Sequence, residues 1–280
     1  MKIVCFEDRR APFIEAFRLS ATQSGYDLAL GPPPADDAAF THFRSIYHHL
    51  SVNLEPFELA CFRRYFAARA TVGLDERVIM ADSDLIVQTA PGELPPAVLD
   101  FGGGVVGSVG VTGGLAETDI SPHFSFWTGR ALAAFCDYLI DVYERSFGRL
   151  QAIHEARGRT AKRVAISDMT LLRLWIEDSG TPFLDANRVF DGVHIDHNVS
   201  VTECANARFR STWGRKALKR TRAGLGFETQ DGAPVAAAVL HLQGRYKLVA
   251  EPLVADRQLR VQQVSAYIAA GRFARSLLAR

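Results

Sequence analysis

The sequence lacks several features that would assign it to a specialised class of protein. Its four cysteines, Cys5, Cys61, Cys136 and Cys204, are scattered and form no CxxC pair. A chain of this length can build a core without disulfides, so we expect core thiols in a reducing compartment. No apolar run approaches the roughly 20 residues that span a bilayer, and Met1–Phe6 is too short for the apolar part of a signal peptide. We therefore predict a cytoplasmic protein.

An excess of charge of one sign is also absent. Lysine and arginine number 32, and aspartate and glutamate number 31. Nucleic acid is therefore not an expected partner, because wholesale electrostatic attraction to a polyanion needs a net positive charge. Hydrophobic residues make up 48% of the chain and charged residues 22%, which is the composition of an ordinary globular protein. We expect one α/β domain over residues 1–280.

The apolar pattern predicts alternating strands and helices. Strands are indicated at Ile3–Phe6, Arg77–Ala81 and Val235–Leu242. Apolar residues recur at helical spacing from Phe13 to Ala21, Phe57 to Ala68, Leu132 to Tyr143, and along the tail Val261–Arg280. This order of elements is typical of an open α/β sheet, in which ligands bind at the carboxyl ends of the strands.

The triplet Asp82-Ser83-Asp84 directly follows the predicted strand Arg77–Ala81. Two carboxylates one residue apart can turn toward the same cation. Hard divalent ions such as Mn²⁺ and Mg²⁺ prefer oxygen ligands that leave room for substrate phosphates. A pair of acids in a surface turn is the alternative explanation, so the triplet needs a partner elsewhere in the chain.

That partner is the segment after the strand that ends near His241. An imidazole at the end of a strand can complete the coordination of a cation, Gly244 allows close approach to a phosphate, and Lys247 supplies a positive charge for a diphosphate. The two motifs, Asp-x-Asp and His-x-x-Gly-x-x-Lys, resemble those of the glycosyltransferase family that includes glycogenin and bacterial galactosyltransferases. The chain departs from the family pattern after Lys247, where Leu248-Val249 replaces the usual Pro-Trp.

The resemblance implies a GT-A-type fold, which is a Rossmann-type mixed, mainly parallel sheet flanked by helices. The nucleotide-binding part would comprise about residues 1–115, and the acceptor part about residues 116–280. The resemblance further implies a metal-dependent enzyme that transfers a sugar from a nucleotide-diphosphate donor, a UDP-sugar, to a carbohydrate or other glycan acceptor with retention.

The same resemblance implies roles for individual residues. Asp82, Asp84 and His241 would bind Mn²⁺ or Mg²⁺, and Lys247 would contact the diphosphate. Phe6, Glu7 and Asp8 end the first strand, where related enzymes seat the base and ribose; ordinary loop acids are an equally good explanation. Ser83 and Gly244 complete the donor side, together with Arg63, which neighbours Arg64 on the helix before the metal strand. Solvated arginines on a helix face are the alternative for that pair.

Ser167 and Asp168 precede a predicted helix over Met169–Ile176. An N-cap carboxylate, worth about 1 kcal/mol, is the favoured explanation. The functional alternative comes from the resemblance, in which an acid at such a helix start lies beside the donor sugar. On that view Asp168 is the catalytic candidate beside Lys247.

The acceptor side is predicted from two clusters. His123 and Trp127 follow a glycine-rich segment, and sugar rings stack well on tryptophan, although packing before the next helix also explains an aromatic residue there. The segment Asp191–Asn198, which includes Asp196 and His197, is assigned to the same side. A solvated loop is the favoured explanation of this segment. Because His194 and Asp196 would project from one face of a strand, a metal-dependent phosphohydrolase is an alternative function.

Basic residues with interleaved aromatic residues gather in Arg208–Arg222. Such a patch could hold a phosphorylated acceptor or contact an anionic surface, and a solvated face is the alternative. The patch suggests a third possible function, a non-catalytic polyanion-binding protein of the same fold.

Overall fold

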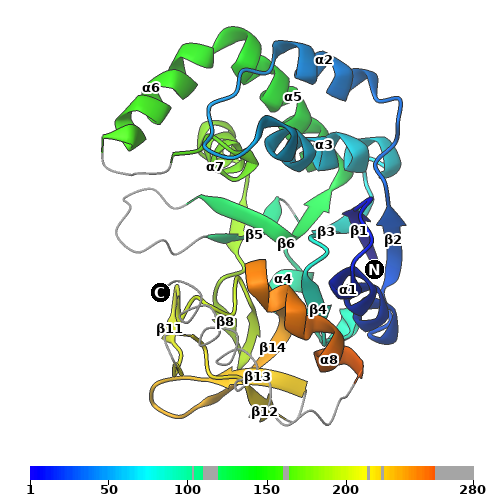
Figure 1. Cartoon of the computed structure of the whole chain (residues 1–280), viewed down its shortest axis with the longest axis vertical. Helices are drawn as coiled ribbons and strands as arrows, with labels where there is room; N and C mark the ends of the chain where they lie inside the picture. The colour runs from blue at the N-terminus through cyan, green and yellow to red at the C-terminus, as the bar shows by residue number, and fades with distance from the viewer. Residues whose placement is uncertain (103, 110–118, 160–163, 213–214, 222–223, 256–280) are drawn as a thin grey trace, which may run out of the picture.

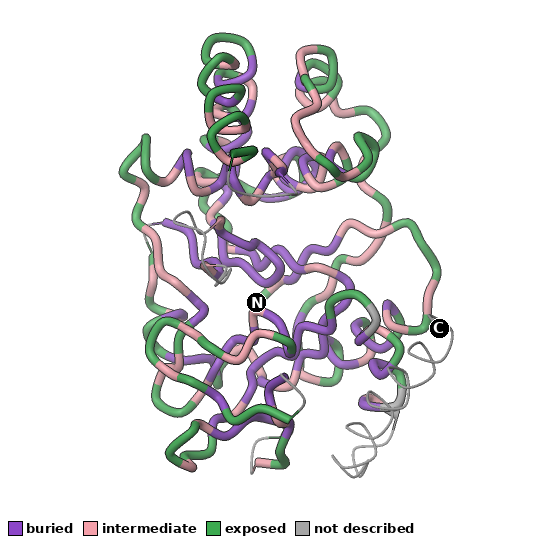
Figure 2. Tube along the Cα trace, turned by 60° about the vertical axis from the view of Figure 1, so that its left-hand side comes forward, coloured by how far each residue is buried: buried purple, intermediate pink, exposed green. Residues whose placement is uncertain are grey.

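The computed structural model describes residues 1–102, 104–109, 119–159, 164–212, 215–221 and 224–255. Two six-stranded sheets and a two-stranded hairpin are present in these ranges. Figure 1 shows a layer of helices over one side of the first sheet and the second sheet beyond its other side. In Figure 2 the buried parts of the trace concentrate in the strands between these outer layers.

The first sheet confirms the predicted mixed, mainly parallel arrangement. β1 pairs in parallel with both β2 and β3, and β5 pairs in parallel with β7. β6 runs antiparallel to its neighbours β3 and β5. The strand order is β2 (Asp27–Gly31), β1 (Lys2–Phe6), β3 (Arg77–Ala81), β6 (Ile120–Thr128), β5 (Val105–Val109) and β7 (Phe183–Asp185).

Helices cover both faces of this sheet, which places the fold in the α/β class. Alternate residues of β1 face opposite sides, so Val4 packs with the helical layer and Ile3 with the core on the side of the second sheet. The helices are α1 (Pro12–Gln23), α2 (Ala38–Ile46), α3 (Glu55–Thr71), α4 (Pro96–Leu99), α5 (Gly129–Arg145), α6 (Phe147–Gly158), α7 (Asp168–Ser179) and α8 (Ala250–Ala255), with short 3₁₀ turns at Pro91–Glu93 (η1) and Gly244–Val249 (η2).

The apolar stripe predicted for α5 is buried, but the face predicted for α3 from Phe57 to Ala68 is partly wrong. Tyr65 is fully buried, whereas Phe57 is 58% exposed. The reason is that α3 also packs against α2, where the rings of Phe62 and Phe43 lie 5.1 Å apart. The buried face is therefore turned away from Phe57.

The second sheet supplies the element that completes the site. Its long strand β14 pairs in parallel with β9 and antiparallel with β13, and the end of β14 pairs antiparallel with β4. The strands are β12 (Lys219–Thr221), β13 (Gly224–Glu228), β14 (Pro234–His241), β9 (Val193–Ile195), β8 (Val189–Phe190) and β4 (Leu85–Val87), and β10 (Glu203–Cys204) forms a hairpin with β11 (Ala207–Arg208).

All four cysteines are free thiols, as expected; Cys5 and Cys136 are buried, and the other two are partly exposed. No helix in the described ranges has both the length and the apolar composition needed to cross a membrane. The predicted tail helix Val261–Arg280 and the predicted boundary near residue 115 lie outside the described residues.

Candidate functional site

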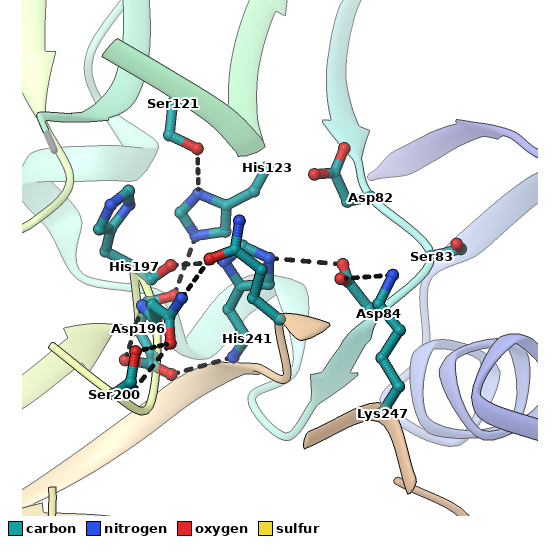
Figure 3. A network of polar contacts seen from close by, with 12 residues as sticks. Asp82, Ser83, Asp84, Ser121, His123, Asp196, His197, Ser200, His241 and Lys247 are labelled. Carbon is teal, nitrogen blue, oxygen red and sulfur yellow. Dashed lines mark hydrogen bonds and ion pairs between the residues drawn. The ribbon is translucent and has the colours of Figure 1, made fainter. Parts of the chain in front are cut away.

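Asp82, Asp84 and His241 come together in the folded chain. One ligand atom from each residue lies within 4.8 Å of the other two. Elsewhere in the described part of the chain, no group of three or more histidine, cysteine, aspartate or glutamate side chains meets the same condition. Figure 3 shows the two aspartates on the segment after β3 and the histidine at the end of β14.

Strand pairing brings these residues together. The chain passes from β3 through Asp82-Ser83-Asp84 into β4, and β4 pairs with the end of β14 so that Leu85 lies opposite His241. The backbone N–H of Leu242 donates to the Asp84 carbonyl over 2.9 Å. The register of one antiparallel pair therefore fixes the spacing between the acidic motif and the histidine.

Asp84 is buried, with 6% of its surface exposed. Its Oδ2 lies 3.0 Å from Lys247 Nζ, and its Oδ1 lies 3.4 Å from His241 Nε2. Oδ1 is buried and has no hydrogen-bond donor. Burial alone would raise the pKa of this carboxyl, but His241 and Lys247 lower it below its ordinary value. A charged carboxylate with an unpartnered buried oxygen is well suited to a cation.

His241 is held so that one ring nitrogen is available. Its Nδ1 contacts the backbone carbonyl of His197. A carbonyl oxygen can only accept, so Nδ1 carries a hydrogen, and Nε2, which faces Asp84, is the nitrogen left to ligate a metal. The ring also stacks on His123 at 4.4 Å between centroids and 8° between planes. This orientation is that of a metal-binding histidine.

Asp82 is more open than Asp84, with its side chain 35% exposed. Its backbone N–H donates to the His123 carbonyl over 2.8 Å, which ties the acidic motif to β6. Its Oδ1 accepts from Arg64 over 2.5 Å. Burial raises the pKa of this carboxyl, although the Arg64 charge opposes the shift.

The structure places Arg64, rather than Arg63, at this site. The Arg64 guanidinium bridges Asp82 and Asp168. Arg63 instead donates to the Pro34 carbonyl over 2.7 Å, away from the acids. Successive residues on a helix point about 100° apart, which is why neighbouring arginines on α3 have different partners. A donor-binding role for Arg63 stays a prediction.

Asp168 does not cap its helix, so the favoured N-cap explanation is wrong. Ser167 is the N-cap residue of α7, and no side-chain hydrogen bond caps this helix. The Asp168 carboxylate is instead 3% exposed and accepts from Arg64 and, over 3.0 Å, from the Tyr65 hydroxyl. Asp168 pairs with Arg64 instead of the helix N-terminus, because the guanidinium is the stronger electrostatic partner. The same guanidinium also contacts Asp82 and so joins the two acids.

The end of β1 also reaches the acidic motif. Ser83 Oγ donates to Glu7 Oε2 over 2.7 Å, and Arg9 donates to both oxygens of Glu7. Burial alone would raise the pKa of Glu7, but these hydrogen bonds lower it to about 2. Phe6 is partly buried and Asp8 is exposed beside it. A donor-binding role for these residues stays a prediction.

Trp127 and His197, both predicted on the acceptor side, differ in burial, because Trp127 lies in the core and His197 is partly exposed. Trp127 is 1% exposed and packs against Tyr65 and Trp175, with its indole N–H donating to Ser125 over 2.8 Å. The structure therefore gives Trp127 a packing position in the core. His197 is partly exposed, and its ring lies 5.4 Å from that of His123 beside the candidate metal group.

The rival metal cluster of Asp191–Asn198 is not formed. Between His194 and Asp196 lies the ammonium group of Lys216, which contacts both side chains and is fully buried. A cation of the protein itself thus occupies the position that the phosphohydrolase alternative requires for a metal. The favoured explanation, a solvated loop, is also wrong for His194 and Asp196, because both are buried against Lys216, which lies outside this segment.

The described members of the basic stretch are largely paired with acids. Arg208 contacts Glu203, while Arg210 and Lys219 both contact Glu228. Arg215 lies over the ring of Tyr246 at 4.7 Å. Arg222 and Trp213 lie outside the described residues. These contacts neutralise much of the charge that a polyanion-binding surface would need.

Neither a protein-family model nor a curated protein sequence matches the chain. Among solved structures, the chain resembles galactosyltransferase LgtC in complex with donor and acceptor sugar analogs (11% identity, TM-score 0.37, 68% of this chain and 75% of that chain). It also resembles the PaToxG glycosyltransferase (10%, 0.38, 64% and 69%). A third similar structure is the glycosyltransferase GlyE of Streptococcus pneumoniae TIGR4 (15%, 0.34, 66% and 45%). Likenesses of this size do not by themselves establish a function.

Proposed function

We propose that this protein is a metal-dependent glycosyltransferase that uses a nucleotide-diphosphate sugar as donor. The observation that carries the proposal is the convergence of Asp82, Asp84 and His241, with Lys247 against the same carboxylate. Both motifs behind the family resemblance therefore meet at one place. A carboxylate pair, an imidazole and an ammonium group form a combination suited to a cation and a diphosphate together.

Asp82, Asp84 and His241 offer a mixture of carboxylate oxygen and imidazole nitrogen that suits a divalent cation able to bind both. Asp84 Oδ1 is a buried oxygen without a donor, and His241 presents Nε2 toward it. Carboxylate oxygens alone would suit Mg²⁺ well, whereas the added imidazole favours Mn²⁺. We propose Asp82, Asp84 and His241 as the protein ligands of that ion, which when bound would stabilise negative charge on the departing diphosphate.

Lys247 supplies a second positive charge at the same place. Its ammonium group lies 3.0 Å from Asp84 and 4.7 Å from the centre of the Phe13 ring, and its side chain is 27% exposed. A partly exposed lysine keeps the freedom to exchange its partner. We propose that Lys247 leaves Asp84 for a phosphate oxygen of the donor, so that the carboxylate becomes available to the cation.

The pair of Asp168 and Arg64 is proposed to position the donor sugar. The Asp168 carboxylate is fixed by Arg64 and Tyr65, and the same arginine holds Asp82 of the metal group. A fixed carboxylate can accept hydrogen bonds from sugar hydroxyl groups and orient the ring. His197, beside the group and partly exposed, is the described residue best placed for the acceptor. A UDP donor, retention and a glycan acceptor follow from the family resemblance.

Calorimetry with a panel of nucleotide sugars, with and without Mn²⁺, tests the proposal. We expect saturable binding that requires Mn²⁺ and disappears in Asp84→Ala and His241→Ala. His42→Ala is the matched control, because His42 pairs with Glu144 on the exposed surface of the helical layer and should leave binding unchanged. Absence of nucleotide binding with every metal tested would refute the proposal.

A further inference from the structure

Asp196 holds the surroundings of His241 through its side-chain Oδ2 and its backbone carbonyl. Its Oδ2 accepts from the backbone N–H of His241 over 3.0 Å. Its backbone carbonyl lies 2.9 Å from Nε2 of His123, whose ring stacks on that of His241. The carbonyl of the next residue, His197, contacts His241 Nδ1. Figure 3 shows this segment wrapped around the histidine on the side opposite Asp84.

A buried lysine balances the charge of Asp196. Lys216 contacts Asp196 Oδ1, and neither side chain is exposed to solvent. The ammonium group also lies 5.0 Å from the ring centre of Phe209 and 4.8 Å from that of Phe227. The lysine is therefore enclosed by two aromatic rings, and its charge has little access to water.

Stability alone is a weak reason for such a pair. Removing two charges from water is costly, and apolar residues of similar volume are often equally or more stabilising. What apolar residues cannot supply is an acceptor for the N–H of His241. The Asp196–Lys216 pair therefore adds less to stability than apolar residues could, but it fixes the backbone N–H of His241 at the candidate metal group.

We propose that Asp196, with its charge balanced by Lys216, is a positioning residue that presets His241 to direct Nε2 toward Asp84. The inference rests on the proposed function, since it assigns His241 to a metal. Partners outside the ligand sphere fix the tautomer and direction of metal-binding histidines, and their loss typically costs about 10- to 100-fold in metal affinity.

Two double variants separate the effect of the hydrogen-bond acceptor for the His241 N–H from the effect of the Asp196 and Lys216 charges. Asp196→Asn/Lys216→Met removes both charges and keeps a side-chain oxygen that can accept from His241. Asp196→Leu/Lys216→Met also removes both charges, with a side chain of similar shape but without the acceptor. Because neither variant leaves a buried ammonium group unpaired, both are expected to fold, and their thermal unfolding midpoints check this.

Two measurements are made on both variants and on the unmodified protein. The first is Mn²⁺ affinity by calorimetry, and the second is the ¹⁵N chemical shift of the His241 ring without metal. We expect the Asn/Met variant to have nearly the Mn²⁺ affinity and the His241 ring shifts of the unmodified protein. The Leu/Met variant should bind Mn²⁺ about 10- to 100-fold more weakly, and its His241 ring should lose the single-tautomer shifts.

The possible failures are distinguishable. Equal Mn²⁺ affinity and unchanged ring shifts in the two folded variants would overturn the positioning role while leaving the proposed metal site intact. Loss of affinity to the same extent in both variants would also overturn it, because the charges rather than the acceptor would then matter. If the unmodified protein bound no Mn²⁺, both the inference and the proposed function would fail.

Discussion

His241 Nε2 lies 3.4 Å from Asp84 Oδ1, although these residues are 157 positions apart in the sequence. The contact depends on β4, a three-residue strand that follows the acidic motif and pairs with the end of β14. Asp84 contributes a buried oxygen without a donor, and His241 contributes a ring nitrogen freed by its other hydrogen bond. Both atoms therefore lie where they could ligate one cation.

Removal of the guanidinium that joins Asp82 and Asp168 should destabilise the protein. Among the described residues, Arg64→Met leaves the buried Asp168 carboxylate with Tyr65 as its remaining hydrogen-bond partner. Breaking a buried ion pair in this way costs about 3–5 kcal/mol, and we expect the lower end because Asp82 is 35% exposed. Urea unfolding measures the change in the free energy of unfolding.

The neighbouring arginine provides the control. Arg63 donates to the Pro34 carbonyl, so Arg63→Met should cost about 1 kcal/mol, the net value of one hydrogen bond. Equal losses for the two variants would contradict the bridging role assigned to Arg64.

Loss of the Lys247 charge should separate metal binding from nucleotide binding. Lys247→Met removes the ammonium group that contacts Asp84, so affinity for Mn²⁺ alone should stay equal or rise. Affinity for UDP in the presence of Mn²⁺ should fall about 10- to 100-fold, since a hydrogen bond to a charged group is worth about 1.5–3 kcal/mol. Both affinities are measured by calorimetry.

Lys219→Met is the control for this experiment, because Lys219 pairs with Glu228 on the second sheet. It should change neither affinity. A parallel fall of Mn²⁺ and UDP affinity in Lys247→Met would mean that the lysine supports the metal site instead of the diphosphate.

Ionisation of the Glu7 carboxylate should make the free energy of unfolding of the protein depend on pH below about 4.5. Its pKa is lowered from 4.5 to about 2 in the folded protein, mainly by hydrogen bonds from Arg9 and Ser83 that outweigh burial. A depressed pKa stabilises the fold fully above pH 4.5, and this contribution is lost as the pH falls toward 2. The stability difference between the unmodified protein and Glu7→Gln should therefore shrink on acidification.

Urea unfolding across this pH range measures that difference. Asp27→Asn, which changes an exposed acid on β2, is the control and should show little effect at any pH. A difference between Glu7→Gln and the unmodified protein that is constant with pH would contradict the proposed ionic role of Glu7.

Trp127 should behave as a core residue. Trp127→Ala removes a side chain packed against Tyr65 and Trp175, and such truncations cost about 3–5 kcal/mol. Phe57→Ala, at a ring that is 58% exposed, should change stability by less than about 0.5 kcal/mol. Normal stability of Trp127→Ala together with weaker sugar binding would instead support the acceptor role predicted from the sequence.

Much of the central sheet could be predicted because its strands carry short, continuous apolar runs. The strand predicted at Arg77–Ala81 has the bounds found in the structure, and the acids follow it directly. β14 ends at His241, close to the end of the predicted strand Val235–Leu242. The local pattern therefore located both halves of the candidate metal group, but not the pairing of β4 with β14 that joins them.

The remaining errors arose where a distant residue decides the role of a local one. Asp168 has the position of a helix cap, yet Arg64 on another helix takes its carboxylate. His194 and Asp196 have the spacing of metal ligands, yet Lys216 fills the position between them. Such partners are set by tertiary packing, and no spacing within the local segment reports them.

Pulsed electron paramagnetic resonance of bound Mn²⁺ shows whether His241 is a ligand, because it detects nitrogen coordinated to the metal. We expect coupling to one imidazole nitrogen in the unmodified protein and loss of that coupling in His241→Gln. Asp84→Ala should greatly weaken binding of the ion. Bound Mn²⁺ without nitrogen coupling, or a coupling that persists in His241→Gln, would contradict the site and the function proposed from it.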